Sequence, residues 1–176
     1  MKILQLKITL KDVKPPVWRR VLVRDRIIQY AMGWFESHLY EFSLGDMIIG
    51  EKDDDWDFNS RYEVKSAKRV KLSSMNFAPK DKFRYVYDFG DDWRHDIVVE
   101  KVLAPEEGIK YPICIGGKRN CPPEDVGGPW GYEDFLEAIQ DPQHPEHESM
   151  LEWVGGSFDT EEFSIDEVNN MLKMIK

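Results

Sequence analysis

The stretch YVYDFGDDWRH, from Tyr85 to His95, decides how the middle of the chain folds. Alternating aromatic residues precede a glycine, and a second alternating run starts at Trp93, which is the pattern of two antiparallel strands joined by a tight turn. A three-residue turn at 90–92 places Phe89 opposite Trp93 and makes one face of the hairpin aromatic or aliphatic, apart from His95. A two-residue turn would mix polar and apolar residues on both faces, which a half-buried sheet penalises. The stretch therefore predicts a β-hairpin with an odd-length turn.

The same stretch carries four groups that suit acid–base or metal chemistry, namely Asp88, Asp91, Asp92 and His95. Carboxylates around Mg²⁺ or Mn²⁺ can orient a water molecule for phosphoryl transfer. One hypothesis is therefore a metal-dependent hydrolase or nuclease that uses these four residues, with Glu124 and Asp125 as further candidates.

Strand parity argues against that hypothesis. Aspartate is common at the tip of a turn because it tolerates unusual backbone angles and forms local hydrogen bonds. Asp88 and His95 are expected on opposite faces of the hairpin, with Asp88 paired to Arg94 across the strands. A structural turn is the alternative interpretation, and an enzymatic role is not favoured.

The N-terminal half shows extended patterns with one helical interruption. Residues 4–11 alternate apolar and polar side chains, two prolines break the run, and residues 17–23 resume it, which predicts an antiparallel pair. The segment 27–32 has helical spacing and is followed by Gly33, a typical residue beyond a helix C-terminus. Residues 37–50 are predicted to be extended, and a polar, acidic loop is expected at 51–60, where the spacing of aspartates does not match a calcium-binding loop.

The C-terminal third has helical spacing instead. Ser164 and Glu167 form a capping-box pattern, and Pro145 suits a first helical position. The expected helices cover YEDFLEAIQ (132–140), PEHESMLEWV (145–154) and SIDEVNNMLKMI (164–175). Strands followed by helices predict an α+β fold, with antiparallel β-hairpins forming a sheet and the C-terminal helices packed against it. We expect a single domain over 1–176, with possible sheet-rich (1–110) and helix-rich (111–176) parts.

Composition excludes several classes of protein. Hydrophobic residues make up 41% of the chain and include six Trp, which excludes a disordered chain. No apolar run is long enough for a membrane span or a signal peptide, so we expect a cytoplasmic protein without membrane contact. Two cysteines are too few for a disulfide scaffold. A monomer is the expected state.

Charge is distributed unevenly along the chain. Residues 1–26 hold eight Lys or Arg against two Asp, a local charge of +6, whereas residues 121–176 hold two Lys against fourteen Asp or Glu, a local charge of −12. The basic end offers Lys7, Arg19 and Arg20 as candidate nucleic-acid contacts. Mutual neutralisation across the fold is the alternative. The basic run 65–71 is either a second candidate nucleic-acid contact or a set of lysines that protects the edge strand of a sheet.

A second set of residues has the ligand chemistry of zinc: Cys114, Cys121, His144 and His147. Six residues separate the cysteines, whereas structural zinc sites usually place two to four between them. Two ordinary thiols are therefore expected, with zinc or a redox pair as alternatives, and no cofactor is predicted. Phosphate-binding and nucleophile motifs such as GxxxxGK[ST], GxGxxG and GxSxG do not occur.

Aromatic residues beside glycine-rich turns suggest a binding surface. The candidates are Trp93, His95, Trp130 and Trp153, with Pro122, Pro123 and Gly127–Gly128 shaping the adjacent loop. Packing alone is the alternative explanation for such residues.

Several strings of the sequence match a known family. LKITLKDVKPPVWRRVLV, YVYDFGDDWRHDIVVE and YPICIGGKRNCPPEDVGGPWGYEDF occur in the order found there, and DFGDDWRH and CPPEDVGG are unusual strings. The chain resembles, from about residue 4 to residue 172, the plasmid pRiA ORF-three-like family, named from a reading frame on a root-inducing plasmid. In this chain only three residues separate Val23 from Ile27, which is fewer than the family pattern has.

The resemblance implies a compact α+β domain with no established catalytic residues, substrate or cofactor. Some relatives are named as passengers of insertion elements, which implies an association with plasmid or mobile DNA. We therefore expect a non-catalytic binding domain that engages a protein or nucleic-acid partner.

Overall fold

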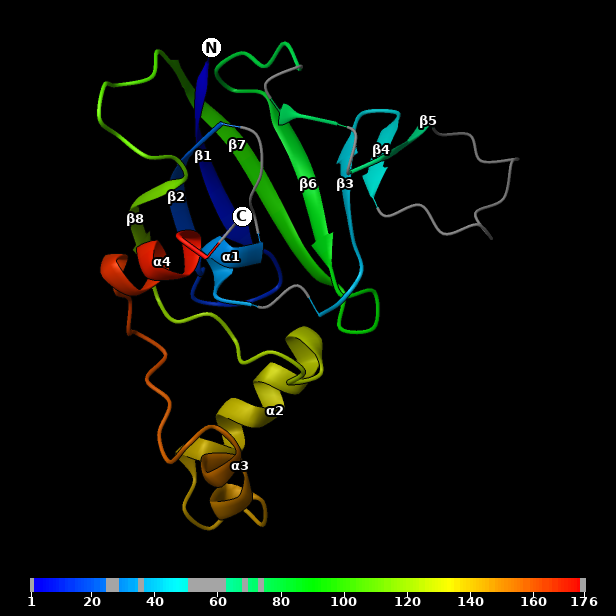
Figure 1. Ribbon diagram of the computed structural model, residues 1–176. Helices are drawn as coiled ribbons and strands as arrows, with labels where there is room; N and C mark the ends of the chain where they lie inside the picture. The colour runs from blue at the N-terminus through cyan, green and yellow to red at the C-terminus, as the bar shows by residue number, and fades with distance from the viewer. Residues whose placement is uncertain are drawn as a thin grey trace.

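A computed structural model describes residues 2–24, 29–34, 37–50, 63–67, 70–72 and 75–174. Its centre is an eight-stranded sheet with the order β5-β4-β3-β6-β7-β1-β2-β8 (Figure 1). Neighbouring strands run antiparallel except β4 and β5, which are parallel. The strands are β1 (Ile3–Leu10), β2 (Trp18–Val23), β3 (Tyr40–Leu44), β4 (Met47–Gly50), β5 (Glu63–Ser66), β6 (Lys82–Tyr87), β7 (Trp93–Leu103) and β8 (Ile113–Lys118).

The helices are α1 (Gln29–Met32), α2 (Gly128–Gln140), α3 (His147–Trp153) and α4 (Ile165–Leu172). Helix α4 contacts strand β8 and helix α1, whereas α2 and α3 pack on each other. Figure 1 shows α2 and α3 extending beyond one end of the sheet; residues 128–153 are called the helical lobe below. The α+β class and the concentration of helices in the C-terminal third are confirmed. Within the described residues, no helix is long and apolar enough to cross a bilayer.

The central hairpin forms with a longer turn than predicted. Tyr87 lies opposite Trp93 and Tyr85 opposite His95, so the turn comprises the five residues 88–92. The predicted three-residue turn was wrong by two residues in register, but its odd length preserves which side chains share a face. The turn is longer because Asp88 and Asp92 both adopt positive φ, at 56°, and leave the strand conformation. The amide of Asp92 donates to the carbonyl of Asp88 at 2.6 Å and closes the loop.

Two predicted helix ends are confirmed. Gly33, with φ of 91°, follows α1, and the hydroxyl of Ser164 accepts a hydrogen bond from the amide of Glu167 at 3.2 Å. Pro145 is not at the first position of α3, because the amide of His147 still closes a turn onto the carbonyl of His144 at 3.0 Å. The predicted loop at 51–60 and most of the short segment after Val23 lie outside the described residues.

The core next to the hairpin is built from aromatic rings. Trp34 stacks on Tyr87 with ring centroids 5.4 Å apart, and its ring also contacts Trp93 at 5.5 Å. Phe83 and Tyr85 continue this face along β6, and both are buried. Burying each large side chain contributes on the order of 2 kcal/mol, so this cluster fixes the position of the turn that follows β6.

Candidate functional site

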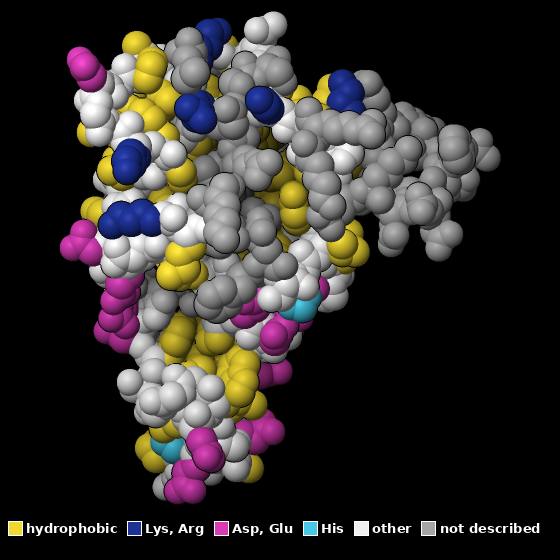
Figure 2. All heavy atoms as spheres, viewed as in Figure 1, with side chains coloured by type: hydrophobic (Ala, Val, Ile, Leu, Met, Phe, Trp, Pro, Cys, Tyr) yellow, Lys and Arg dark blue, Asp and Glu magenta, His cyan; other side chains and the backbone are white. Residues whose placement is uncertain are grey.

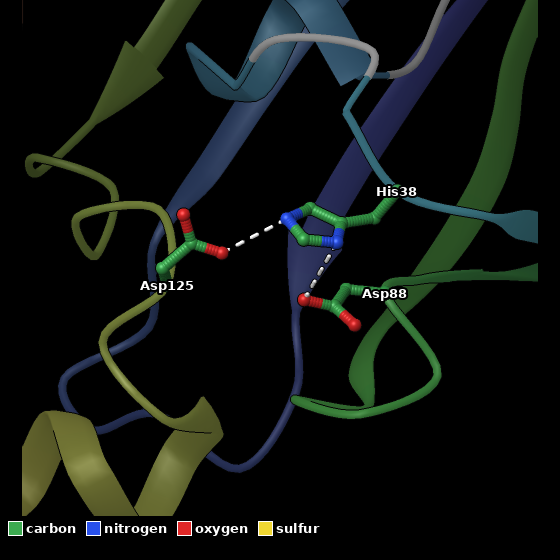
Figure 3. A group of neighbouring side chains, drawn as sticks. All are labelled: His38, Asp88 and Asp125. Atoms are coloured by element: carbon green, nitrogen blue, oxygen red, sulfur yellow. Dashed lines mark ion pairs between the residues drawn. The ribbon is translucent and has the colours of Figure 1, made fainter.

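Three segments that are distant in the sequence meet at the turn of the central hairpin. His38 lies just before β3, Asp88 directly after β6, and Asp125 in the loop before α2 (Figure 3). One ligand atom from each side chain can be chosen so that all three lie within 4.8 Å of one another. Within the described part of the chain, this is the grouping of three His, Cys, Asp or Glu side chains close enough to share a metal ion.

The imidazole of His38 lies between the two carboxylates. Its Nδ1 is 3.5 Å from Oδ2 of Asp88, and its Nε2 is 2.9 Å from Oδ1 of Asp125. Despite this short distance, Nε2 is buried and has no hydrogen-bond partner among the described residues, so the contact with Asp125 lacks hydrogen-bond alignment. The three side chains form a small polar cluster that solvent reaches on the Asp125 side, where the carboxylate is 68% exposed.

Both aspartates of the cluster have a left-handed backbone conformation. Asp88 has φ of 56° and Asp125 has φ of 62°, a region that aspartate and asparagine enter more readily than other residues with a side chain. The Asp88 carboxylate also accepts the amide of Gly90 at 2.9 Å, which holds the turn in this conformation. Such conformations cost about 1 kcal/mol or more each and concentrate at functional sites.

The loop that carries Asp125 is fixed against the hairpin turn. The amide of Gly127 donates to the Asp91 carboxylate at 3.1 Å, and the indole of Trp34 donates to the carbonyl of Pro122 at 3.0 Å. Gly128 has φ of +71°, and a Cβ at this position would overlap the carbonyl oxygen of Asp91. The glycine pair in CPPEDVGG therefore permits a close approach of two backbones, which sets the distance between the two carboxylates of the cluster.

Tyr87 packs against the histidine of the cluster. The ring of Tyr87 makes an edge contact with His38 at 5.8 Å, and its hydroxyl donates a short hydrogen bond to Glu124. Burial, together with the Glu124 carboxylate, raises the pKa of Tyr87 well above its ordinary value. The hydroxyl therefore stays protonated near neutral pH and acts as a hydrogen-bond donor that positions the residue before Asp125.

The predicted catalytic set of Asp88, Asp91, Asp92 and His95 is not brought together. Asp92 pairs with Arg94, whose Nε lies 3.0 Å from Oδ1, and Asp91 binds the backbone of Gly127. The predicted pairing of Asp88 with Arg94 was wrong, because the five-residue turn places Arg94 opposite Val86. Of the four residues, Asp88 alone belongs to the cluster, and it meets Asp125, which the hydrolase hypothesis also named.

The proposed aromatic binding surface divides into two parts. Trp93 is 1% exposed and His95 is 0% exposed, so both belong to the core. His95 has Nδ1 at 3.3 Å from the carbonyl of Tyr85, and its Nε2 has no hydrogen-bond partner among the described residues. Burial lowers the pKa of His95 to about 4. Trp130 and Trp153, by contrast, are 81% and 49% exposed on the helical lobe.

The four residues considered for zinc do not converge within the described part of the chain. Cys121 is buried, and its sulfur accepts a hydrogen bond from Nη2 of Arg19 at 3.1 Å, while Cys114 lies in β8 with its Sγ 3.4 Å from the carbonyl of Gly116. Both thiols are free, and burial raises the pKa of each. His144 lies in the turn between α2 and α3, and His147 is the first residue of α3, where its Nδ1 is 2.9 Å from the carbonyl of Ala138.

The basic candidates differ in their surroundings. Arg19 is 4% exposed and cannot reach a nucleic acid, which corrects its assignment as a contact. Lys7 and Arg20 both contact the Trp18 ring, at 5.2 and 5.1 Å from its centroid. Arg20 also forms an ion pair with Glu100 at 2.6 Å. In the run 65–71, residues 68 and 69 lie outside the described residues, and Lys65 is on β5, the edge strand.

His38 is the member of the cluster that the sequence did not reveal. It precedes an ordinary strand, has no neighbouring histidine or cysteine, and is separated from Asp88 by fifty positions. The signals that existed were indirect, since Asp125 lies two residues before the glycine pair of CPPEDVGG and Asp88 lies two residues before Gly90 of the turn.

Comparison with known proteins places the chain in a family. The family model described as plasmid pRiA4b ORF-3-like protein matches residues 2–167. The chain belongs to this family. A similar curated protein is the uncharacterized protein y4hQ of Sinorhizobium fredii (strain NBRC 101917 / NGR234), 42% identical over 164 residues, covering 88% of this chain and 82% of the relative. A similar crystal structure is that of MM3350 from Methanosarcina mazei Go1, a protein of unknown function, with a TM-score of 0.82, 36% identity, and coverage of 94% of this chain and 96% of that one.

Proposed function

We propose that this protein is a non-catalytic binding domain linked to plasmid or mobile DNA, and that its helical lobe engages a protein partner with a basic surface. The link to plasmids rests on the name of the family. The observation that carries the choice of partner is the exposure of Trp130, at 81%, on an acidic helix face. A largely solvent-exposed tryptophan on the surface of a folded protein is typical of an interaction site, because tryptophan supplies much of the binding energy in interfaces.

The acidic face of α2 surrounds this tryptophan. Glu133, Asp134 and Glu137 follow Trp130 at spacings of three, four and seven residues, which places them on the same side of the helix. The opposite side is buried through Tyr132, Phe135 and Ala138. The helix therefore presents an indole bordered by carboxylates to solvent.

The acidic character extends over the whole lobe. Residues 128–153 contain no Lys or Arg. Figure 2 shows acidic side chains around a hydrophobic area at the helical end of the molecule, with Lys and Arg gathered at the sheet end. A single-sign field of this kind steers oppositely charged partners and repels others of the same sign. All seven carboxylates of the lobe are exposed: Glu133, Asp134, Glu137, Asp141, Glu146, Glu148 and Glu152.

A basic protein surface fits this lobe better than a nucleic acid does. Phosphates would be repelled by the seven carboxylates, whereas Lys and Arg of a protein partner would pair with them. At the sheet end, the ion pair of Arg20 with Glu100 and the burial of Arg19 reduce the charge available to phosphates. The helical lobe is therefore the surface we assign to the partner.

Affinity capture with matched variants tests the proposal. The tagged full chain, its Trp130→Ala variant and an Ile115→Ala control, which trims a 42% exposed side chain on β8, are compared in lysate of the source organism. We expect a protein retained by the parent chain and the control and reduced at least about tenfold by Trp130→Ala. The retained protein should carry a basic surface and elute with salt.

Two results would refute the proposal. The first is equal capture by the parent chain and Trp130→Ala. The second is salt-sensitive retention on DNA that persists in Trp130→Ala and is lost in Lys7→Glu, which would assign a nucleic-acid partner to the sheet. Because Trp130 is exposed, its removal should leave the unfolding temperature unchanged, so a loss of capture reports on the surface itself.

A further inference from the structure

A polar cluster outside the helical lobe has the composition of a metal site. His38, Asp88 and Asp125 come from three segments, and their ligand atoms lie within 4.8 Å of one another (Figure 3). We propose that these three side chains bind one divalent transition-metal cation of the Zn²⁺ type, with the fourth position open to water. This proposal is independent of the partner assigned to the helical lobe.

The Nε2 nitrogen of His38 is available to a cation. Its Nε2 is buried and has no hydrogen-bond partner among the described residues, although a carboxylate oxygen of Asp125 is 2.9 Å away. A buried ring nitrogen without a hydrogen bond destabilises the fold, and a cation bound to Nε2 would remove that penalty. Nδ1 lies 3.5 Å from Oδ2 of Asp88, so both carboxylates lie within reach of this imidazole.

The loops that carry the ligands are held in place before any ion binds. Asp88 and Asp125 both adopt left-handed backbone, and the hydrogen bond from Gly127 to Asp91 keeps the two loops together. Hydrogen bonding between Tyr87 and Glu124 fixes the residue that precedes Asp125. Ligand atoms in a tetrahedral zinc site are about 3.3 Å apart, given bonds of about 2 Å, so small side-chain rotations are sufficient to close the set.

The three side chains are of the types that bind Zn²⁺ in proteins. One imidazole and two carboxylates combine the nitrogen that Zn²⁺ and similar ions prefer with oxygens that neutralise a charge of +2. Asp125 is 68% exposed and Asp88 is 14% exposed, so the site opens to solvent on one side. This arrangement of three protein ligands with one open position differs from a closed structural zinc site.

Calorimetric titration of the full chain with Zn²⁺, after removal of bound metal with EDTA, tests the assignment. We expect one ion per chain, and an affinity that falls at least about tenfold in each of His38→Ala, Asp88→Asn and Asp125→Asn. Asparagine tolerates left-handed backbone as aspartate does, so the two Asn variants keep the loop and remove only a charged ligand. Asp92→Asn is the matched control, because Asp92 has the same φ of 56° in the same turn but pairs with Arg94.

Absorption spectra of the Co²⁺ form distinguish this site from a cysteine site. We expect visible bands typical of nitrogen and oxygen ligands, without the intense near-ultraviolet band of thiolate ligation. An affinity unchanged in Asp88→Asn and Asp125→Asn, or a thiolate band, would overturn the assignment. Displacement of Zn²⁺ by equimolar Mg²⁺ would overturn it as well. Thermal unfolding of each metal-free variant verifies the fold. If His38→Ala does not fold, Asp125→Asn still tests the site, because its position is largely exposed.

Discussion

The buried imidazole of His95 makes the stability of this protein depend on pH. The side chain is 0% exposed, its ring packs edge-on against Trp34 at 5.4 Å, and burial lowers its pKa to about 4 from 6.5. Above pH 6.5 the imidazole is neutral in both the folded and the unfolded chain, so it adds no pH dependence there. Below pH 6.5 the imidazole is protonated in the unfolded chain but stays neutral in the folded chain, so the unfolding free energy falls until about pH 4.

The size of this effect follows from the two pKa values. A difference between about 4 and 6.5 corresponds to about 3 kcal/mol of unfolding free energy, at about 1.4 kcal/mol per pH unit. About 2 kcal/mol of that loss has occurred at pH 5, where most carboxylates are still ionised. Such a loss is a large share of the stability of an ordinary domain.

Urea unfolding at pH 7 and pH 5 measures the loss. The parent chain should lose about 2 kcal/mol more between these pH values than His95→Leu, which has nothing to protonate at this position. His95→Gln is a second non-titrating variant that keeps polar atoms next to the carbonyl of Tyr85. The comparison between chains cancels the contribution of other titrating groups. If the parent chain and both variants lose equal stability, His95 is not the buried neutral group described here.

Three further substitutions test how the loops and helices are held. Gly128→Ala should lower the unfolding temperature more than Gly108→Ala, because both glycines have positive φ but only the first would meet backbone atoms; equal effects would contradict the close approach. Asn169→Ala should lower the unfolding free energy in urea by about 2 kcal/mol, because the Asn169 amide forms two hydrogen bonds with the backbone of Cys114 in β8. A change near zero would contradict that contact. Ser164→Ala should cost about 1 kcal/mol through loss of the α4 cap, which guanidinium unfolding would detect, and no change would argue against the cap.

Strand parity made the hairpin predictable from the sequence, whereas its turn was not. The alternation around Tyr85 and Trp93 fixed which side chains are buried, and the sheet confirms it. The length of the turn depended on the left-handed conformations of Asp88 and Asp92, and sequence cannot separate a three-residue from a five-residue turn when both keep the same faces. Helices were predicted because their apolar spacing and the Ser164 cap are local signals.

The polar cluster depended on tertiary contacts and therefore could not be predicted. His38 meets Asp88 because β3 pairs with β6, and Asp125 joins them because Gly128 allows its loop to approach the turn. Conversely, His95 was a candidate catalytic residue because three aspartates are near it in the sequence, yet its side chain points from the strand into the core. Adjacency in sequence is a poor guide to chemistry across a hairpin, since neighbouring residues point to opposite faces.

Site-specific photo-crosslinking in cells of the source organism tests the proposed partner surface most directly. A photoreactive residue replaces Glu137, which follows Trp130 by two helical turns on the exposed face of α2, or replaces the exposed Lys82 on β6 as a control. The proposal predicts a protein adduct from position 137, at a surface rich in Lys and Arg, that is absent from position 82 and disappears with Trp130→Ala. A nucleic-acid adduct, or equal protein adducts from both positions, would contradict it.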